Sequence, residues 1–367
     1  MGQDGALPEG GIVNPLVALA ILLSLAGTLF MLPLLPALVE LHRKSDARPL
    51  NVIQQHAGEI KHFADGFRSY IKELEPILHE SFNSQAAVFG TLPDGTDYLV
   101  LGRGDEALRL PLKEQDGLCP MLIATSSNLV LPPDIKFSKD IYSGGEFIGG
   151  AKNQYRAILG EKEVHLSSKS CVLRWVHAVG DFQADSDCEL YGRISSDRHI
   201  RLRSGCNFRR LNAPKIEIGA EDKDFSALAA SHNPLVQAST RRLLLDGDFN
   251  IPSGEVFSGN LVVRGVLHIG AKARVQGSVK GDKGVVLEDS VAVEGSLMSA
   301  TRMRIGTNCD IHGPVIAERD IVIERGTHCG SHDQPTTVSA PSIAVQEGVV
   351  VFGTLWAREH GQVAEHS

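Results

Sequence analysis

The sequence predicts a mainly β protein: a single-stranded parallel β-helix of 18-residue coils, preceded by a transmembrane helix and a small α+β segment. Three observations support this fold class. Apolar residues recur every eighteen residues over much of the chain. Glycine is abundant (37 of 367 residues) while aromatic residues make up only 5%. One uncharged apolar run lies near the amino terminus.

The uncharged run covers residues 15–39 and reads PLVALAILLSLAGTLFMLPLLPALV. A helix needs about 20 apolar residues to cross the hydrocarbon core of a bilayer, so this run is long enough. A signal peptide is the alternative, but no basic residue precedes the run and no small-x-small cleavage site follows it. Basic residues follow the run between positions 43 and 48, and such flanks stay cytoplasmic. We therefore expect a single-pass protein of the cell inner membrane, with residues 1–14 outside and the bulk of the chain cytoplasmic.

The next segment, 45–143, is predicted to combine a helix with short strands. Apolar residues such as Ile60, Phe63 and Phe67 fall at helical spacing within 51–82, and such a stripe usually packs onto its own domain. From residue 86 onward, short apolar runs alternate with turn residues, as in short strands. We expect this segment to cap one end of the β-helix.

The repeat is clearest in four consecutive blocks that start at Gly259, Gly277, Gly295 and Gly313. In each block the third, ninth and eleventh positions are apolar, and the same register recurs upstream. The predicted core columns contain Ile158, Val176, Ile194, Leu261, Val279, Leu297 and Val315 (third position), Leu267, Val285, Met303 and Ile321 (ninth), and Ile269, Leu287, Ile305 and Ile323 (eleventh).

Apolar residues two apart indicate extended strands whose alternate side chains point the same way. Three such strands in eighteen residues describe a coil with three short faces, and stacked coils satisfy their backbone groups through parallel neighbours. We expect a first array at 156–218 and a second at 241–357, roughly ten coils in all, with an excursion or linker at 219–240 and a polar tail at 358–367.

Composition argues against several functions. The net charge is −8 and no basic patch is interleaved with aromatics, so we expect no nucleic-acid partner. The six cysteines form no CxxC pair, which argues against a zinc site or a disulfide framework, and we expect no metal, no cofactor and no catalytic residues. Several of the cysteines fall in the apolar columns and are expected to be small buried residues: Cys188, Cys206, Cys309 and Cys329.

The stretch GNLVVRGVLHIGAKARVQGSVKGDKGVVLEDSVAVEGSLMSA, continued by IHGPVIAERDIVIERG, resembles the bactofilins, polymer-forming cytoskeletal proteins of bacteria. The resemblance covers roughly 241–357. It implies a right-handed β-helix that associates end to end, often at the membrane and without nucleotide. The chain departs from the usual bactofilin pattern in its membrane span, its 45–143 segment and its additional array.

The carboxyl-terminal coil has only a short tail to cover it. We therefore predict that Leu355 and Trp356 form a self-association end, while the 45–143 segment blocks growth at the other end. The expected partners are the membrane, further copies of the chain and possible envelope proteins.

Two other functions stay open. Hexapeptide-repeat acyltransferases also use 18-residue coils with a histidine base, and the candidate histidines here are His165, His177, His199, His268, His312, His328 and His332. A non-polymerising binding module for an envelope component would use outward-facing residues of the flat faces, such as Arg264, Lys280, Arg302 and Arg319. A scaffold without enzymatic activity is the function that the sequence favours.

Overall fold

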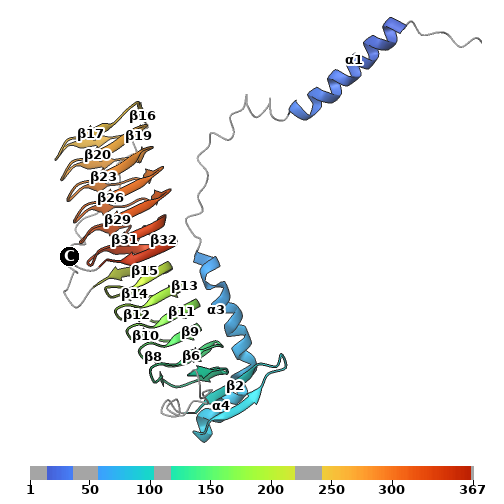
Figure 1. The fold of residues 1–367 in the computed structure, drawn as a ribbon, viewed down its shortest axis with the longest axis vertical. Helices are drawn as coiled ribbons and strands as arrows, with labels where there is room; N and C mark the ends of the chain where they lie inside the picture. Colours follow the sequence, from blue (N-terminus) through green and yellow to red (C-terminus); the bar gives the residue numbers. More distant parts are fainter. Residues whose placement is uncertain (1–14, 36–56, 103–116, 220–241, 365–367) are drawn as a thin grey trace, which may run out of the picture. The chain divides into compact units, whose positions relative to one another are not determined.

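The computed structural model describes residues 15–35, 57–102, 117–219 and 242–364 (Figure 1). The chain divides into two compact units, Met1–Ile53 and Gln54–Ser367. In the first unit, helix α1 (Pro15–Met31) continues into a 3₁₀ turn, η1 (Leu32–Leu34). No helix in the described part of the chain combines the length and the apolar character needed to cross a membrane. Positions 36–39 of the predicted span lie outside the described residues.

The second unit is a parallel β-solenoid of about 12 turns, which confirms the mainly β, parallel β-helical part of the predicted fold class. Its coils have three faces. The first face consists of β1 (Val88–Thr91), β2 (Asp97–Leu101), β4 (Leu122–Thr125), β7 (Ile141–Ser143), β9 (Gln154–Gly160), β11 (Cys171–Ala178), β13 (Glu189–Ser196), β15 (Asn207–Ile218), β32 (Val350–Val363), β31 (Thr336–Val345), β28 (Val315–Ala317), β25 (Leu297–Ser299), β22 (Val279–Gly281), β19 (Asn260–Val263) and β16 (Arg242–Leu245).

The long strands turn corners between faces: the third face shares β9, β11, β13, β15, β31 and β32 with the first, and the second face shares β15 and β32 with it. The second face adds β5 (Leu129–Val130), β8 (Phe147–Gly149), β10 (Val164–Leu166), β12 (Phe182–Ala184), β14 (His199–Leu202), β30 (His328–Cys329), β27 (Asp310–Ile311), β24 (Ala292–Val293), β21 (Arg274–Gln276) and β18 (Val256–Ser258). The third adds β3 (Leu118–Cys119), β6 (Lys136–Phe137), β29 (Asp320–Ile323), β26 (Arg302–Ile305), β23 (Gly284–Leu287), β20 (Val266–Ile269) and β17 (Phe249–Ile251).

The two arrays meet at their last coils. Strand β15 ends the first array and β32 ends the second, and these two strands pair antiparallel along almost their whole length. The second array therefore begins at the far end of the solenoid, at β16, and runs back toward the first (Figure 1). All three faces continue across this junction, although the strand direction reverses there.

One hydrophobic core runs through both arrays and across the junction. Every residue of the core columns named above is at most 2% exposed, and each stands opposite its neighbour in the adjacent coil, as in the series Leu261, Val279, Leu297, Val315. Cys188, Cys206, Cys309 and Cys329 are buried in the same core. The repeat is kept because each apolar side chain must sit against its equivalents in the coils on either side.

A helical segment covers part of the first face. It comprises α3 (Ala57–Ile71), η3 (Lys72–Leu74) and α4 (Glu75–Ser84). Phe67 packs edge-on against Trp175 with ring centroids 5.7 Å apart, and the Arg68 guanidinium bonds both carboxylate oxygens of Glu161. The expectation that the apolar stripe packs onto its own domain is met by Phe67, Ile71 and Leu74, whereas Phe63 is 45% exposed.

The solenoid begins earlier and ends later than the sequence predicted. Parallel stacked strands start at β2, near residue 97, instead of 156. Ile141 stands opposite Ile158, a step of seventeen residues, and this single deletion hides the eighteen-residue register upstream. The predicted polar tail at 358–367 is strand up to Val363, because Gly361 lies against the ring of Phe208 and Val363 is buried. The predicted linker at 219–240, apart from Gly219, lies outside the described residues.

Candidate self-association edge

In the described part of the chain, the first coil of the second array has a neighbouring coil on one side only. Strand β16 pairs with β19, β17 with β20 and β18 with β21, and each leaves its other edge unpaired among the described residues. We call this coil, Arg242–Ser258, the edge coil. Unpaired strand edges present a row of backbone donors and acceptors that can pair with another chain.

The edge coil also exposes part of the hydrophobic core. Leu243, Leu245, Phe249 and Phe257 are only partly buried, although they occupy core columns. Their equivalents one coil inward, such as Leu261 and Leu267, are 0% exposed. On the outer side of the same coil, Leu244 and Val256 are 57% and 59% exposed. The edge coil is therefore a strand edge and an apolar surface at once, a combination typical of association sites.

The predicted self-association end is not available for that role. Leu355 is fully buried and stands opposite Leu211 of the first array, so another part of the same chain already covers the last coil. Trp356 is 39% exposed, and the Arg210 guanidinium lies over its ring at 4.9 Å from the centroid. The sequence did contain a signal for the edge coil. The register restarts at Arg241 after a break, and the first coil after a break has no preceding coil of its own array.

A Ser–His–Asp group lies under α3, and it was not recognised from the sequence. His177 Nδ1 is 2.9 Å from Ser195 Oγ, and His177 Nε2 is 3.8 Å from Asp197 Oδ1. Ser195 Oγ donates to the carbonyl oxygen of Val176, and Asp197 is bonded to Lys61 of α3. In a catalytic triad the histidine must donate to the acid, and the 3.8 Å between His177 Nε2 and Asp197 Oδ1 is too long for that hydrogen bond. His177 and Ser195 are each 2% exposed, so we interpret the group as a buried structural contact.

Burial lowers the pKa of His177 below its ordinary value of 6.5, against an opposing effect of Asp197. The charged groups facing it are Asp197 from the solenoid and Lys61, Asp65 and Arg68 from α3. As pH falls through 6.5, the unfolded chain takes up a proton that the folded chain does not, so stability is lost on acidification and regained as pH rises.

We expect His177→Asn to make the free energy of unfolding less dependent on pH between 7.5 and 5.5, by at most about 1.4 kcal/mol per pH unit. Denaturant titrations at the two pH values measure the effect, and His332→Gln, at an exposed histidine, is the matched control. An unchanged pH slope in His177→Asn contradicts the prediction.

The other histidines and the cysteines have structural surroundings. His165, His199 and His312 each lie within 4 Å of an aspartate on the outer surface, at 3.1, 3.6 and 3.2 Å. Burial raises the pKa of the Cys309 thiol to about 11 and that of Cys329 to about 12, so both are protonated and unreactive near neutrality. Over the residues that the structure describes, no group of three or more His, Cys, Asp or Glu side chains could hold a metal ion.

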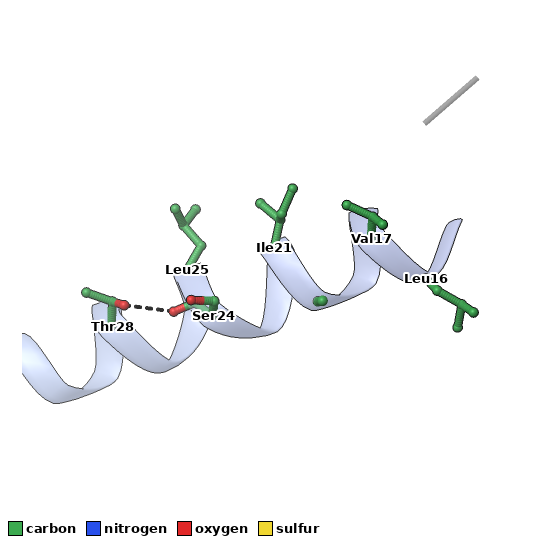
Figure 2. A pocket seen from close by; sticks show the side chains of 7 residues that line it. Leu16, Val17, Ile21, Ser24, Leu25 and Thr28 are labelled. Atoms are coloured by element: carbon green, nitrogen blue, oxygen red, sulfur yellow. Dashed lines mark hydrogen bonds between the residues drawn. The ribbon is translucent and has the colours of Figure 1, made fainter. Parts of the chain in front are cut away.

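Two hollows lie elsewhere. A cleft of about 350 Å³ between α3 and the solenoid is lined by Phe67, Tyr70 and Asp94 on one side and by Asp140 and Arg156 on the other. Burial raises the pKa of Asp140, and Arg156 is 3.4 Å from it. The second hollow is a shallow surface on α1 alone, where Val17, Ile21 and Leu25 point to the same side (Figure 2). Neither hollow assembles groups with a recognisable catalytic geometry.

The comparisons with known proteins identify no relative: no protein family, curated protein or solved structure matches the chain.

Proposed function

We propose that the protein is a structural scaffold without catalytic activity, bactofilin-like in kind, which self-associates through the edge coil and is held at a membrane by its amino-terminal apolar segment. The observation that carries the proposal is the edge coil itself. Three strand edges, which no other described residue pairs with, surround core side chains that are only half covered. A second solenoid coil placed there would pair all three edges and bury those side chains together.

The rest of the solenoid supports a scaffold in preference to an enzyme. Its interior is filled by one continuous apolar core, and the histidine and acid of the Ser–His–Asp group are 3.8 Å apart, too far for the hydrogen bond that a catalytic triad needs. The resemblance of 241–357 to the bactofilins favours the same function. Long faces of charged side chains, such as the ion pairs Arg302–Asp320 and Arg304–Glu324, keep the sides of the rod hydrated. Association is thereby directed to the edge coil.

Membrane attachment is supported by the character of α1. Its described side chains are apolar apart from Ser24 and Thr28, and the Thr28 hydroxyl is satisfied by donating to the carbonyl oxygen of Ser24 at 2.8 Å (Figure 2). Leu16 and Phe30 are 73% and 78% exposed. Apolar surface of this extent is stable in lipid or detergent. The basic residues that follow position 39 in the sequence would place the solenoid on the cytoplasmic side.

Self-association is tested with charged substitutions in the edge coil. We expect Phe249→Glu and Phe257→Glu to raise the dissociation constant of the full-length protein, in density-matched detergent, at least about tenfold. The reason is that each carboxylate would have to be buried on association. Sedimentation equilibrium measures the constant, and the midpoint of thermal unfolding shows that the variants still fold.

Val322→Glu adds the same charge on the outer face of β29 and is the matched control, because Val322 is 38% exposed and distant from the edge coil in the strand order. It should associate like the unsubstituted protein. A protein that sediments as a monomer at every concentration overturns the proposed function, as does association that the edge substitutions leave unchanged.

A further inference from the structure

The junction between the two arrays shows which strands meet when two coils of this solenoid join end to end. Resting on the proposed function, we infer that two copies of the chain join at their edge coils by antiparallel pairing. In this pairing β16 meets β16 of the second copy and β17 meets β18, which gives a closed two-fold dimer in place of a filament.

When the junction residues are numbered by their position in the 18-residue repeat, their pairing follows one rule. Third positions stand opposite third positions, and ninth positions stand opposite seventeenth positions. Leu211 and Leu355 both occupy the third position and stand opposite each other. Phe208, at the seventeenth position, stands opposite Gly361 at the ninth. Ile216, at the ninth position, stands opposite Val351 at the seventeenth.

This rule is what a two-fold axis perpendicular to the solenoid requires. The axis reverses the strand direction, so the first-face strands of the two coils pair with each other. The second-face strand of each coil then pairs with the third-face strand of the other. The junction joins two last coils, whereas the edge coil is a first coil. The rule carries over because it depends on the reversal of the chain and not on which end is joined.

When the rule is applied to the edge coil, it places the half-buried apolar residues of the two copies opposite each other. Leu243 is at the third position, Phe249 at the ninth and Phe257 at the seventeenth, as their partners Leu261, Leu267 and Val275 show. Leu243 would therefore meet Leu243 of the second copy. Each Phe249 would meet the second copy's Phe257. Both aromatic pairs and the leucine pair are apolar on both sides, so these three contacts bury no charge.

The outer positions are also compatible. At the junction, Arg210 stands opposite Trp356 and its guanidinium lies over the ring. The equivalent residues of the edge coil are Arg242 and Leu244, at the second and fourth positions. The stem of Arg242 would lie over the second copy's Leu244, which is more than half exposed in the single chain.

The two ends of the solenoid differ, and this limits the assembly. At the end remote from the edge coil the first face finishes in β1, which is antiparallel to β2, with α4 packed beside β2. A contact that uses the same surface on both copies closes at two subunits, because it leaves no second copy of that surface to extend the assembly.

The strand pairing is tested by disulfide trapping at the tenth and sixteenth positions, which stand opposite each other at the junction as Asn207–Gln362 and Glu217–Val350. In the edge coil these positions are Asn250 and Val256, both exposed. Directly opposed residues of antiparallel strands have Cα atoms about 4.5–5.5 Å apart, within the range of a disulfide. The variants are Asn250→Cys and Val256→Cys in the full chain.

We expect a mixture of the two single variants, allowed to exchange subunits and then oxidised mildly, to form cross-linked dimers in at least about tenfold excess over either variant alone. Val262→Cys, one coil inward on the first face, replaces Val256→Cys in the control mixture. The unsubstituted protein gives the background from its six native cysteines, five of which are buried.

The outcomes separate the two proposals. A protein that is monomeric by sedimentation overturns both. A protein that associates through the edge coil, but shows no excess of cross-linking in the mixture or forms assemblies larger than a dimer, overturns the strand pairing and leaves the proposed function standing.

Discussion

Replacing Gly295 with alanine is expected to destabilise the solenoid by about 3 kcal/mol, an unusually large effect for adding one methyl group. A Cβ atom at Gly295 would lie 2.4 Å from the carbonyl oxygen of Gly277, one coil away. The neighbouring atom is backbone and not the tip of a flexible side chain, so the two coils would have to move apart. That movement would lengthen hydrogen bonds between them.

The matched control is Gly66→Ala on α3. Gly66 is exposed, and a Cβ atom there would meet nothing within 4 Å. Alanine in a helix interior is more favourable than glycine by about 1 kcal/mol, so this substitution should stabilise. Denaturant titration of both variants gives effects of opposite sign if close approach of coils is the reason for the glycine. A neutral result at Gly295 would mean that the coils tolerate wider spacing.

The glycine repeat therefore has a more specific cause than its sequence spacing suggested. Regular spacing by itself is explained equally well by a glycine at a corner, where the chain must bend. The structure shows that Gly277, Gly295 and Gly313 stack over one another, and a side chain on any of them would contact the backbone of the preceding coil. At Gly277 the φ of 154° would also strain a residue with a side chain. At Gly295 and Gly313 only the lack of space excludes a side chain.

The direction of stacking could not be predicted from the repeat. Spacing specifies which residues lie over one another within an array, as in Val285, Met303 and Ile321. It carries no information about which coil the last one meets, because an antiparallel neighbour needs the same apolar column as a parallel one. The reversal at β15 and β32 is a long-range event between residues such as Leu211 and Leu355, far apart in the chain.

The candidate site followed from this reversal. The sequence predicted the thinly covered end of an array at Leu355 and Trp356. Because the second array folds back onto the first, its last coil is covered, whereas no residue in the described ranges covers its first coil. The exposed Leu244 and partly buried Phe249 are ordinary repeat residues by sequence, and only their position at the edge distinguishes them.

The junction itself should depend strongly on Leu355. We expect Leu355→Asp to destabilise the protein by about 4 kcal/mol or more at pH 7, because the carboxylate would be enclosed between Leu211 and Val338 without a partner charge. Leu243→Asp changes the same column position in the edge coil. There the carboxylate keeps contact with water in the single chain, and the expected loss is below about 1.5 kcal/mol.

Denaturant titration under dilute conditions compares the two variants, and hydrogen exchange localises the effect. In Leu355→Asp, the amides of β15 and β32 should lose protection while those of β22 and β25, inside the second array, keep it. Burial would raise the pKa of the new carboxyl in the folded chain above its unfolded value, so part of the lost stability should return as pH falls from 7 toward 4. Equal losses in the two variants would show that the last coil is as open as the first, which would remove the physical basis for placing self-association at the edge coil.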